Sequence, residues 1–126
     1  MKKTYSTPLA PATSKAISQG TSNGAVGYIC GQISVELDGA TAIRDDITGQ
    51  TCRVLGYVGE VLKAMGKTYD DLLMCHVFLR DLEDFDAFCR AYEAFFGSNP
   101  PARITVRADI WNELLVEVSA VVDMQN

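Results

Sequence analysis

The spacing of apolar residues predicts two helices. Between residues 48 and 65, apolar side chains recur at helical spacing and form a single stripe, made of Val54, Leu55, Val58, Val61, Leu62 and Met65. Asp45 and Asp46 precede this segment and Gly66 follows it, which is typical of a helix start and a helix end. A second helix is predicted from residue 85 to residue 96, where aromatic residues recur at the same spacing.

Strands are predicted where apolar and polar residues alternate or where β-branched residues gather. Asn23-Gly24 separates two strand-like runs and is the dipeptide that a two-residue hairpin turn prefers. Residues 7–16 are rich in proline and alanine, so we expect them to form an extended arm. With the two helices the order of elements is ββαβαββ, and the predicted strands cover residues 17–21, 26–33, 73–80, 102–108 and 114–122.

This order of elements predicts an α+β sandwich. We expect a mixed sheet of five or six strands with two helices on one face, and residues 1–126 forming a single domain. The opposite face of the sheet also carries apolar residues, and a chain of 126 residues has no further layer that would cover it. We therefore expect the protein to associate with copies of itself through this face.

Composition and charge exclude several classes of protein. The chain has 11 Lys+Arg and 16 Asp+Glu, a formal net charge of −5, and no basic cluster that would follow a phosphate backbone, so no nucleic-acid partner is expected. Long apolar runs and a secretory pattern are both lacking, which favours a cytoplasmic protein without a membrane partner. The four cysteines lack metal-ligand spacing and nucleotide-binding motifs are absent, so neither a metal nor a cofactor is expected.

Two charged residues lie within the apolar runs of the last two predicted strands, Arg103 and Glu117. One interpretation is a structural ion pair between neighbouring strands. The other is a site for a small organic acid, in which the planar guanidinium of Arg103 binds a carboxylate through two hydrogen bonds and Glu117 orients water and transfers protons. His76, the only histidine, has no partners at catalytic or metal-ligand spacing and is expected to be structural.

Several short motifs resemble one family along most of the chain. They are Thr7-Pro-Leu-Ala-Pro-Ala, Ser18-Gln19, Cys30-Gly31-Gln32-Ile33, Gln50-Thr51-x-Arg53-x-Leu55, Val77-Phe78-Leu79-x-Asp81-Leu82-x-Asp84-Phe85, Tyr92-Glu93-Ala94-Phe95-Phe96, Pro101-Ala102-Arg103 and Val116-Glu117-Val118-x-Ala120. Each motif is short, but their order and spacing from residue 7 to residue 120 are specific. The chain therefore resembles the RidA/YjgF family of reactive intermediate deaminases.

The resemblance implies a chorismate-mutase-like fold, assembled as a homotrimer with sites in clefts between subunits. It also implies that the protein hydrolyses 2-aminoacrylate, 2-iminopropanoate and related imino and enamine acids to 2-keto acids and ammonia without a cofactor. By this resemblance Arg103 binds the substrate carboxylate, Glu117 orients the water, and backbone groups of Gly31 and Thr105 complete the pocket. An imine carbon is already electrophilic, so the protein mainly has to hold the carboxylate, position a water and transfer protons.

Two positions of the implied substrate pocket depart from the family pattern. Ile17 stands where the family commonly has a tyrosine, and Cys89 stands where an asparagine is usual. Loss of the tyrosine hydroxyl favours bulkier apolar substrates or lowers activity. Two functions therefore stay open, hydrolysis of imino acids and a non-catalytic regulatory trimer that binds small acids. The acidic charge disfavours the family's older description as RNA-cleaving proteins.

Overall fold

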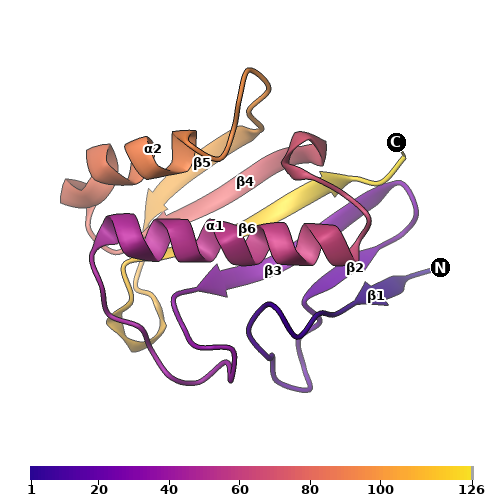
Figure 1. Ribbon diagram of the computed structural model, residues 1–126, viewed down its shortest axis with the longest axis horizontal. Helices are drawn as coiled ribbons and strands as arrows, with labels where there is room; N and C mark the ends of the chain where they lie inside the picture. The colour runs from indigo at the N-terminus through magenta and orange to yellow at the C-terminus, as the bar shows by residue number, and fades with distance from the viewer. Residues whose placement is uncertain (126) are drawn as a thin grey trace.

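The computed structural model describes residues 1–125, which contain six strands and two α-helices (Figure 1). In chain order these are β1 (Lys3–Tyr5), β2 (Gly20–Ser22), β3 (Val26–Ile33), α1 (Ile47–Ala64), β4 (Leu72–Leu79), α2 (Phe85–Glu93), β5 (Ala102–Arg107) and β6 (Val116–Asp123). Short 3₁₀ helices lie in three of the connections, namely η1 (Tyr69–Asp71), η2 (Leu82–Asp84) and η3 (Trp111–Glu113). Both predicted helices and the longer predicted strands are thus confirmed.

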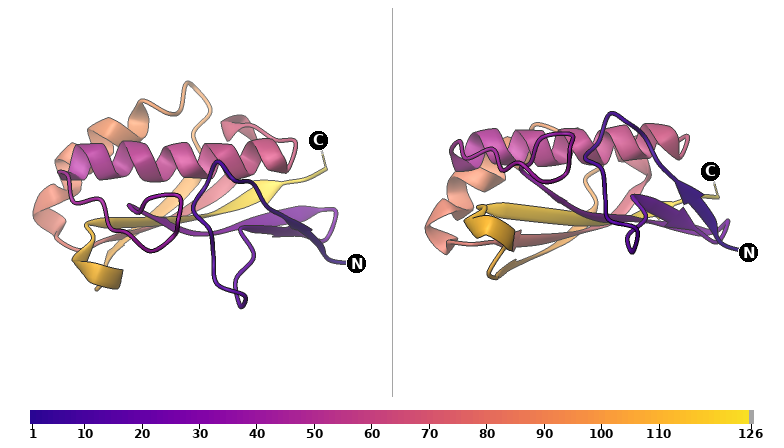
Figure 2. Two further views of the ribbon diagram at one scale, coloured as in Figure 1. Left: turned by 60° about the horizontal axis from the view of Figure 1, so that its bottom comes forward. Right: turned by 90° about the horizontal axis from the view of Figure 1, so that it is seen from below.

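All six strands join one sheet in the order β1-β2-β3-β6-β4-β5. Strands β4 and β5 run parallel and every other neighbouring pair is antiparallel, so the predicted mixed sheet is confirmed. Figure 2 shows both helices on one side of this sheet, as expected for the predicted α+β sandwich. The sequence does not predict β1, because three residues are too few to show an alternation of polar and apolar positions.

The hairpin between β2 and β3 is confirmed, but its strand and turn differ from the prediction. Strand β2 begins at Gly20 rather than Ile17. Gly24 has a φ of 94° and is the one residue of the turn with a positive φ. Asn23 contributes through its side chain instead, since its Oδ1 accepts hydrogen bonds from the backbone N–H groups of Ala25 and Val26 at 3.0 and 2.9 Å.

Helix α1 buries its apolar stripe against the middle of the sheet. Asp46 caps the first turn by accepting a hydrogen bond from the Gly49 backbone N–H at 2.9 Å, and Gly66 follows the helix with a φ of 74°. The core between helix and sheet has no solvent exposure at Val54, Leu55, Val58, Val61, Leu62, Val77, Leu79, Val116, Val118 and Val122. Burying each such side chain contributes about 1.5–3 kcal/mol.

Within residues 1–125 no helix is long and apolar enough to cross a membrane.

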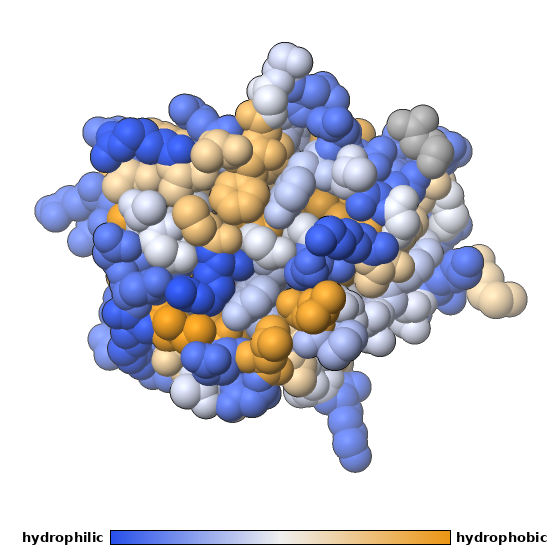
Figure 3. Space-filling view, viewed as in Figure 1, coloured by the Kyte–Doolittle hydropathy of each residue, from blue (hydrophilic) through white to orange (hydrophobic). Residues whose placement is uncertain are grey.

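The two faces of the sheet differ because side chains alternate along each strand. On β6, Val116 and Val118 are buried beneath the helices, whereas Glu117 and Ser119 point to the other face and are half-buried. On the helix side, hydrophilic groups surround separate apolar patches (Figure 3). We call the opposite face the open face. Three of its large apolar residues are 42–52% exposed to solvent, namely Tyr28, Ile104 and Val106.

The segment between β1 and β2 is an irregular arm that is fixed by one buried glutamine. Gln19 is only 5% exposed, and its Oε1 accepts a hydrogen bond from the Thr7 backbone N–H at 2.6 Å. Its Nε2 donates to the backbone carbonyls of Ala10 and Pro11 at 3.3 and 2.9 Å. The arm also contacts the loop after β3, where the Ala12 backbone N–H donates to the Leu37 carbonyl at 3.0 Å. Gln19, next to the start of β2, therefore holds the first half of the predicted arm, from Thr7 to Pro11.

Replacing Gln19 with alanine is expected to lower the free energy of unfolding by about 1–3 kcal/mol, because the buried carbonyls of the arm lose their donor. Urea denaturation measures the change, and limited proteolysis is expected to cut Gln19→Ala first within residues 7–16. Gln125→Ala is the matched control, since Gln125 is exposed. Equal stability and equal proteolysis of the two variants would contradict a fixing role for Gln19.

Candidate functional site

Arg103 and Glu117 lie on opposite faces of the sheet. Strand β4 separates their strands, and Arg103 is in register with Cys75 of β4 whereas Glu117 is in register with Phe78. Arg103 points to the side of the helices and Glu117 to the open face. The hypothesis of a structural ion pair between the two residues is therefore wrong, because neighbouring strands were its premise and β5 and β6 are not neighbours.

The guanidinium of Arg103 lies against the aromatic side of α2. Its Cζ is 5.9, 5.4 and 4.8 Å from the ring centroids of Phe85, Phe88 and Tyr92. Its Nη2 lies 3.6 Å from Sγ of Cys89, a long contact to a weak acceptor. Within residues 1–125 Arg103 forms no ion pair. The cation is thus held by ring faces, which attract it by about 0.5–2 kcal/mol each and leave its hydrogen-bond donors available.

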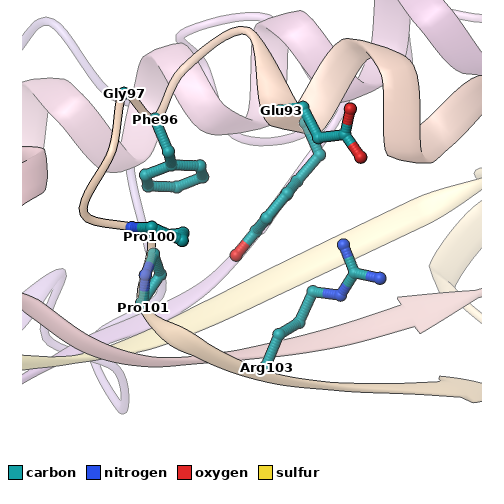
Figure 4. A pocket seen from close by; sticks show the side chains of 7 residues that line it. Glu93, Phe96, Gly97, Pro100, Pro101 and Arg103 are labelled. Carbon is teal, nitrogen blue, oxygen red and sulfur yellow. The ribbon is translucent and has the colours of Figure 1, made fainter.

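A pocket of about 600 Å³ lies beside this guanidinium, lined by Tyr92, Glu93, Phe96, Gly97, Pro100, Pro101 and Arg103. Figure 4 shows Arg103 extending from β5 towards α2. Glu93 lies on the helix, and Pro100 and Pro101 lie on the segment that leads into β5. Burial raises the pKa of both Tyr92 and Cys75, which lie near Arg103. Both groups are neutral at physiological pH, so neither offers Arg103 a negative charge.

Glu117 lies against a bulge in β3 on the open face. The pairing of β3 with β6 shifts between Ile29 and Gln32, which places Cys30 and Gly31 in the bulge. A Cβ on Gly31 would collide with Oε2 of Glu117, so the carboxylate occupies the space that a side chain here would take. Burial raises the pKa of the Glu117 carboxyl above its usual 4.5. Burial, with a smaller effect of nearby Glu117, also raises the pKa of Cys30.

A second pocket, of about 390 Å³, adjoins this bulge, and we call it the bulge pocket. Its lining comes from the arm, from β3 and the loop that follows it, and from η3: Pro11, Ala12, Thr13, Ser14, Ile17, Cys30, Gly31, Gln32, Ile33, Val35, Gly39, Ala40 and Trp111. The close approach of arm and loop requires Gly39, because a Cβ there would collide with the Ala12 carbonyl oxygen. Ile17 and Gly31 therefore share one pocket beside Glu117.

The six residues expected at the site fall into two groups. Arg103 and Cys89 meet where β5 approaches α2, and Thr105 follows Arg103 on the same side of β5, in register with Val77. The other three, Ile17, Gly31 and Glu117, gather around the bulge pocket. Within one chain the groups lie on opposite faces of the sheet, so they do not form a common site there.

Sequence reasoning missed two features of these groups. The aromatic spacing between residues 85 and 96 predicts a helix but not that Phe85, Phe88 and Tyr92 lie on the side that meets Arg103. Trp111 lies between the predicted strands 102–108 and 114–122, and no periodicity indicates that it lines a pocket.

Comparison with known proteins identifies the family. A family model described as Endoribonuclease L-PSP, which represents the RidA/YjgF proteins, matches residues 7–124. The chain belongs to the RidA/YjgF family. A RutC family protein from Saccharolobus solfataricus is 34% identical over 122 residues, covering 96% of this chain and 97% of that protein. A 2-iminobutanoate/2-iminopropanoate deaminase from Salmonella typhimurium is 32% identical over 125 residues, covering 96% and 97%.

Solved structures of RidA/YjgF proteins share the fold. The crystal structure of E. coli TdcF with bound serine superposes with a TM-score of 0.89 at 26% identity, and the match covers 96% of this chain and 98% of TdcF. A Rid family protein from Yersinia pestis superposes with a TM-score of 0.92 at 26% identity, covering 98% and 99%. The predicted chorismate-mutase-like fold is thus confirmed for this RidA/YjgF protein.

Replacing Gly31 with alanine is expected to move the Glu117 carboxylate away from the bulge at a cost of at most about 1–3 kcal/mol of stability, because the end of a glutamate side chain can rotate. Once displaced towards solvent, Glu117 is expected to lose the effect of burial, so its pKa falls towards 4.5. Carbon-13 NMR titration of the Glu117 carboxyl measures this change.

Gly56→Ala is the matched control for Gly31→Ala. A Cβ on Gly56 meets no atom within 4 Å, so this change within α1 is expected to leave the Glu117 titration unaltered and to raise stability by about 0.5–1 kcal/mol. The contact between Gly31 and Glu117 is refuted if Gly31→Ala titrates like the parent protein.

Proposed function

We propose that this RidA/YjgF protein hydrolyses 2-imino acids and their enamine tautomers to 2-keto acids and ammonia. In this reaction water adds to the imine carbon and forms a C–O bond. The C–N bond then breaks, and the nitrogen leaves as ammonia after it has received a proton. One water is consumed per imine, and no electrons are exchanged. The deaminase from Salmonella typhimurium at 32% identity supports this class of reaction.

The observation that carries the proposal is the guanidinium of Arg103, which forms no ion pair within residues 1–125 and lies beside a pocket. Its ring contacts fix its position without using its hydrogen-bond donors. A substrate carboxylate can accept two parallel hydrogen bonds from such a planar group, each contributing about 1.5–3 kcal/mol. We assign to Arg103 the binding of the substrate carboxylate, with Cys89 and the backbone of Thr105 beside it.

Glu117 is assigned the proton transfers. Burial raises the pKa of its carboxyl, and a base whose pKa lies nearer to neutrality exchanges protons with water more effectively. As a carboxylate it can orient a water and take its proton, and as an acid it can return that proton to the leaving nitrogen. The backbone of Gly31 lies directly beside it.

A complete site requires a second copy of the chain, because the Arg103 group and the Glu117 group lie on opposite faces of the sheet. The exposed apolar side chains of the open face favour such self-association. We therefore propose a homotrimer in which Arg103 of one subunit and Glu117 of its neighbour face the same cleft.

A second candidate function is the binding of small acids without turnover. It is favoured by Ile17, which offers no hydroxyl to the bulge pocket, and by Cys89, a weak hydrogen-bond partner for Arg103. The two functions differ in one measurement. A hydrolase accelerates keto-acid release when an amino-acid oxidase generates the imine, whereas a binding protein is stabilised by 2-keto acids and leaves that rate at background.

Nucleic acid is not among the proposed partners. The matching family model is described as an endoribonuclease, but the chain carries a net charge of −5. Affinity for a phosphate backbone depends on clustered lysine and arginine.

Mixing two inactive variants is expected to restore activity. Arg103→Ala and Glu117→Gln each remove one half of every site, so each alone is expected to hydrolyse the 2-imino acid derived from alanine at the background rate. After subunit exchange in a 1:1 mixture, about one quarter of the sites are intact, because half of the subunits supply Arg103 and half of their neighbours supply Glu117. Keto-acid release at about one quarter of the parent rate is the expected result.

The double variant Arg103→Ala/Glu117→Gln, mixed with the parent protein, is the control for subunit exchange. If that control exchanges fully while the mixture of single variants stays at background, the two residues do not meet across subunits and the proposed site is wrong.

Activity is expected to fall in acid as Glu117 becomes protonated, since the protonated acid cannot take a proton from water. Burial raises the pKa of Glu117, so the acid limb of the plot of kcat/KM against pH is expected to lie above pH 4.5. Initial rates, corrected for uncatalysed hydrolysis, give this profile. If Glu117→Gln keeps the same fall of kcat/KM in acid, that fall belongs to another titratable group and not to Glu117.

A further inference from the structure

We propose that Trp111 and Ile17 bind the substrate's side chain and make this protein selective for 2-imino acids with branched or aromatic apolar side chains. The inference rests on the proposed function and names its substrate class. It concerns the bulge pocket, where Trp111 comes from η3 and Ile17 from the arm. Both side chains are about half exposed, 52% for Trp111 and 51% for Ile17, although both are large and apolar.

The position of Trp111 is fixed by an unusual backbone. The two residues that follow it, Asn112 and Glu113, have φ values of 54° and 57°, a conformation that costs energy for residues other than glycine. Arg44 holds Asn112 through hydrogen bonds from Nη1 to the backbone carbonyl at 2.7 Å and from Nη2 to Oδ1 at 2.5 Å. Arg80 lies 3.5 Å from the Glu113 carboxylate.

Buried residues anchor both ends of the same turn. Ile110 and Leu114 are 6% and 0% exposed and pack with Val35 in a small second core. Between them the chain exposes Trp111 towards the bulge pocket rather than burying it. A strained turn that is held on both sides and presents an exposed indole is typical of a functional position.

The chemistry of the bulge pocket fits an apolar group. Beside Trp111 and Ile17, the apolar residues Pro11, Ile33 and Val35 contribute to its lining. Its volume of about 390 Å³ is within the range of small-ligand pockets and exceeds what the methyl group of an alanine-derived substrate fills. A branched or aromatic side chain would remove more of this apolar surface from water.

In the proposed site, the bulge pocket lies next to the Glu117 carboxylate, where the substrate's side chain would enter it. Gly31 lines the bulge pocket and also contacts the Glu117 carboxylate. A substrate whose imine carbon lies beside Glu117 therefore has the bulge pocket within reach of the substituent on that carbon. Its carboxylate points away, towards Arg103 of the neighbouring subunit.

Kinetics with two imines test the inference. An amino-acid oxidase generates the imines of leucine and of alanine, and keto-acid release gives kcat/KM for each. The parent protein is expected to prefer the leucine-derived imine by about 10-fold or more, since each added methylene in an apolar pocket contributes substantially to discrimination. Trp111→Ala and, independently, Ile17→Ala are expected to lower kcat/KM about 10-fold more for the leucine-derived imine than for the alanine-derived imine.

Leu82→Ala is the matched control, because Leu82 is 53% exposed and does not line the bulge pocket. It is expected to change neither value. Equal losses for both imines in Trp111→Ala and Ile17→Ala, or a parent protein that prefers the alanine-derived imine, would overturn the inference.

Binding separates this inference from the proposed function. Calorimetric titration with 4-methyl-2-oxopentanoate and with pyruvate is expected to show a preference of about 10-fold for the larger acid in the parent protein and in Leu82→Ala, but not in Trp111→Ala. Trp111 is the only tryptophan, so its emission is expected to shift to shorter wavelength when 4-methyl-2-oxopentanoate binds. If the protein prefers the larger keto acid but does not hydrolyse imines, the proposed function is refuted and the role of the bulge pocket is supported. If it hydrolyses imines but shows no preference between the two acids, the role of the bulge pocket is refuted and the proposed function is supported.

Discussion

The alternation of side chains along a β-strand determines how a site can be built in this protein. Neighbouring residues of a strand point to opposite faces, so a residue cannot change face without a shift of register. Arg103 is directed to the helices by its register with buried Cys75, and Glu117 is directed to the open face between buried Val116 and Val118. The site that we propose must therefore lie between subunits.

The surroundings of Arg103 show how a fold can hold a charge without neutralising it. An ion pair with a carboxylate of the same chain would satisfy the guanidinium and leave little for a ligand. The rings of Phe88 and Tyr92 instead stabilise the cation through their faces, and the hydroxyl of Tyr92, whose pKa burial raises further above neutrality, stays protonated. The donors of the guanidinium stay available for a planar acceptor.

The helices and the longer strands could be predicted because apolar residues repeat along them with the period of a helix or of a strand. The grouping of the site residues could not, because it depends on β4 lying between β5 and β6, an arrangement that the chain order of the strands does not reveal. Glu117 could be nominated from its charge within an apolar run and Gly31 from resemblance, but their direct contact follows from a bulge that has no sequence period. Trp111 escaped prediction because its position depends on the left-handed backbone of Asn112 and Glu113.

If the bulge pocket binds the substrate's side chain as we propose, substrate preference can vary while the fold is kept. Its lining comes from irregular segments that are far apart in the sequence, and each is fixed by polar contacts outside the main core. Gln19 holds the arm that carries Ile17, and Arg44 holds the turn that carries Trp111. Since both side chains are about half exposed, replacing either one alters the pocket without opening a cavity under α1. In the function that we propose, the sheet positions Arg103 and Glu117 for the reaction, and the exposed side chains of the arm and the turn select its substrate.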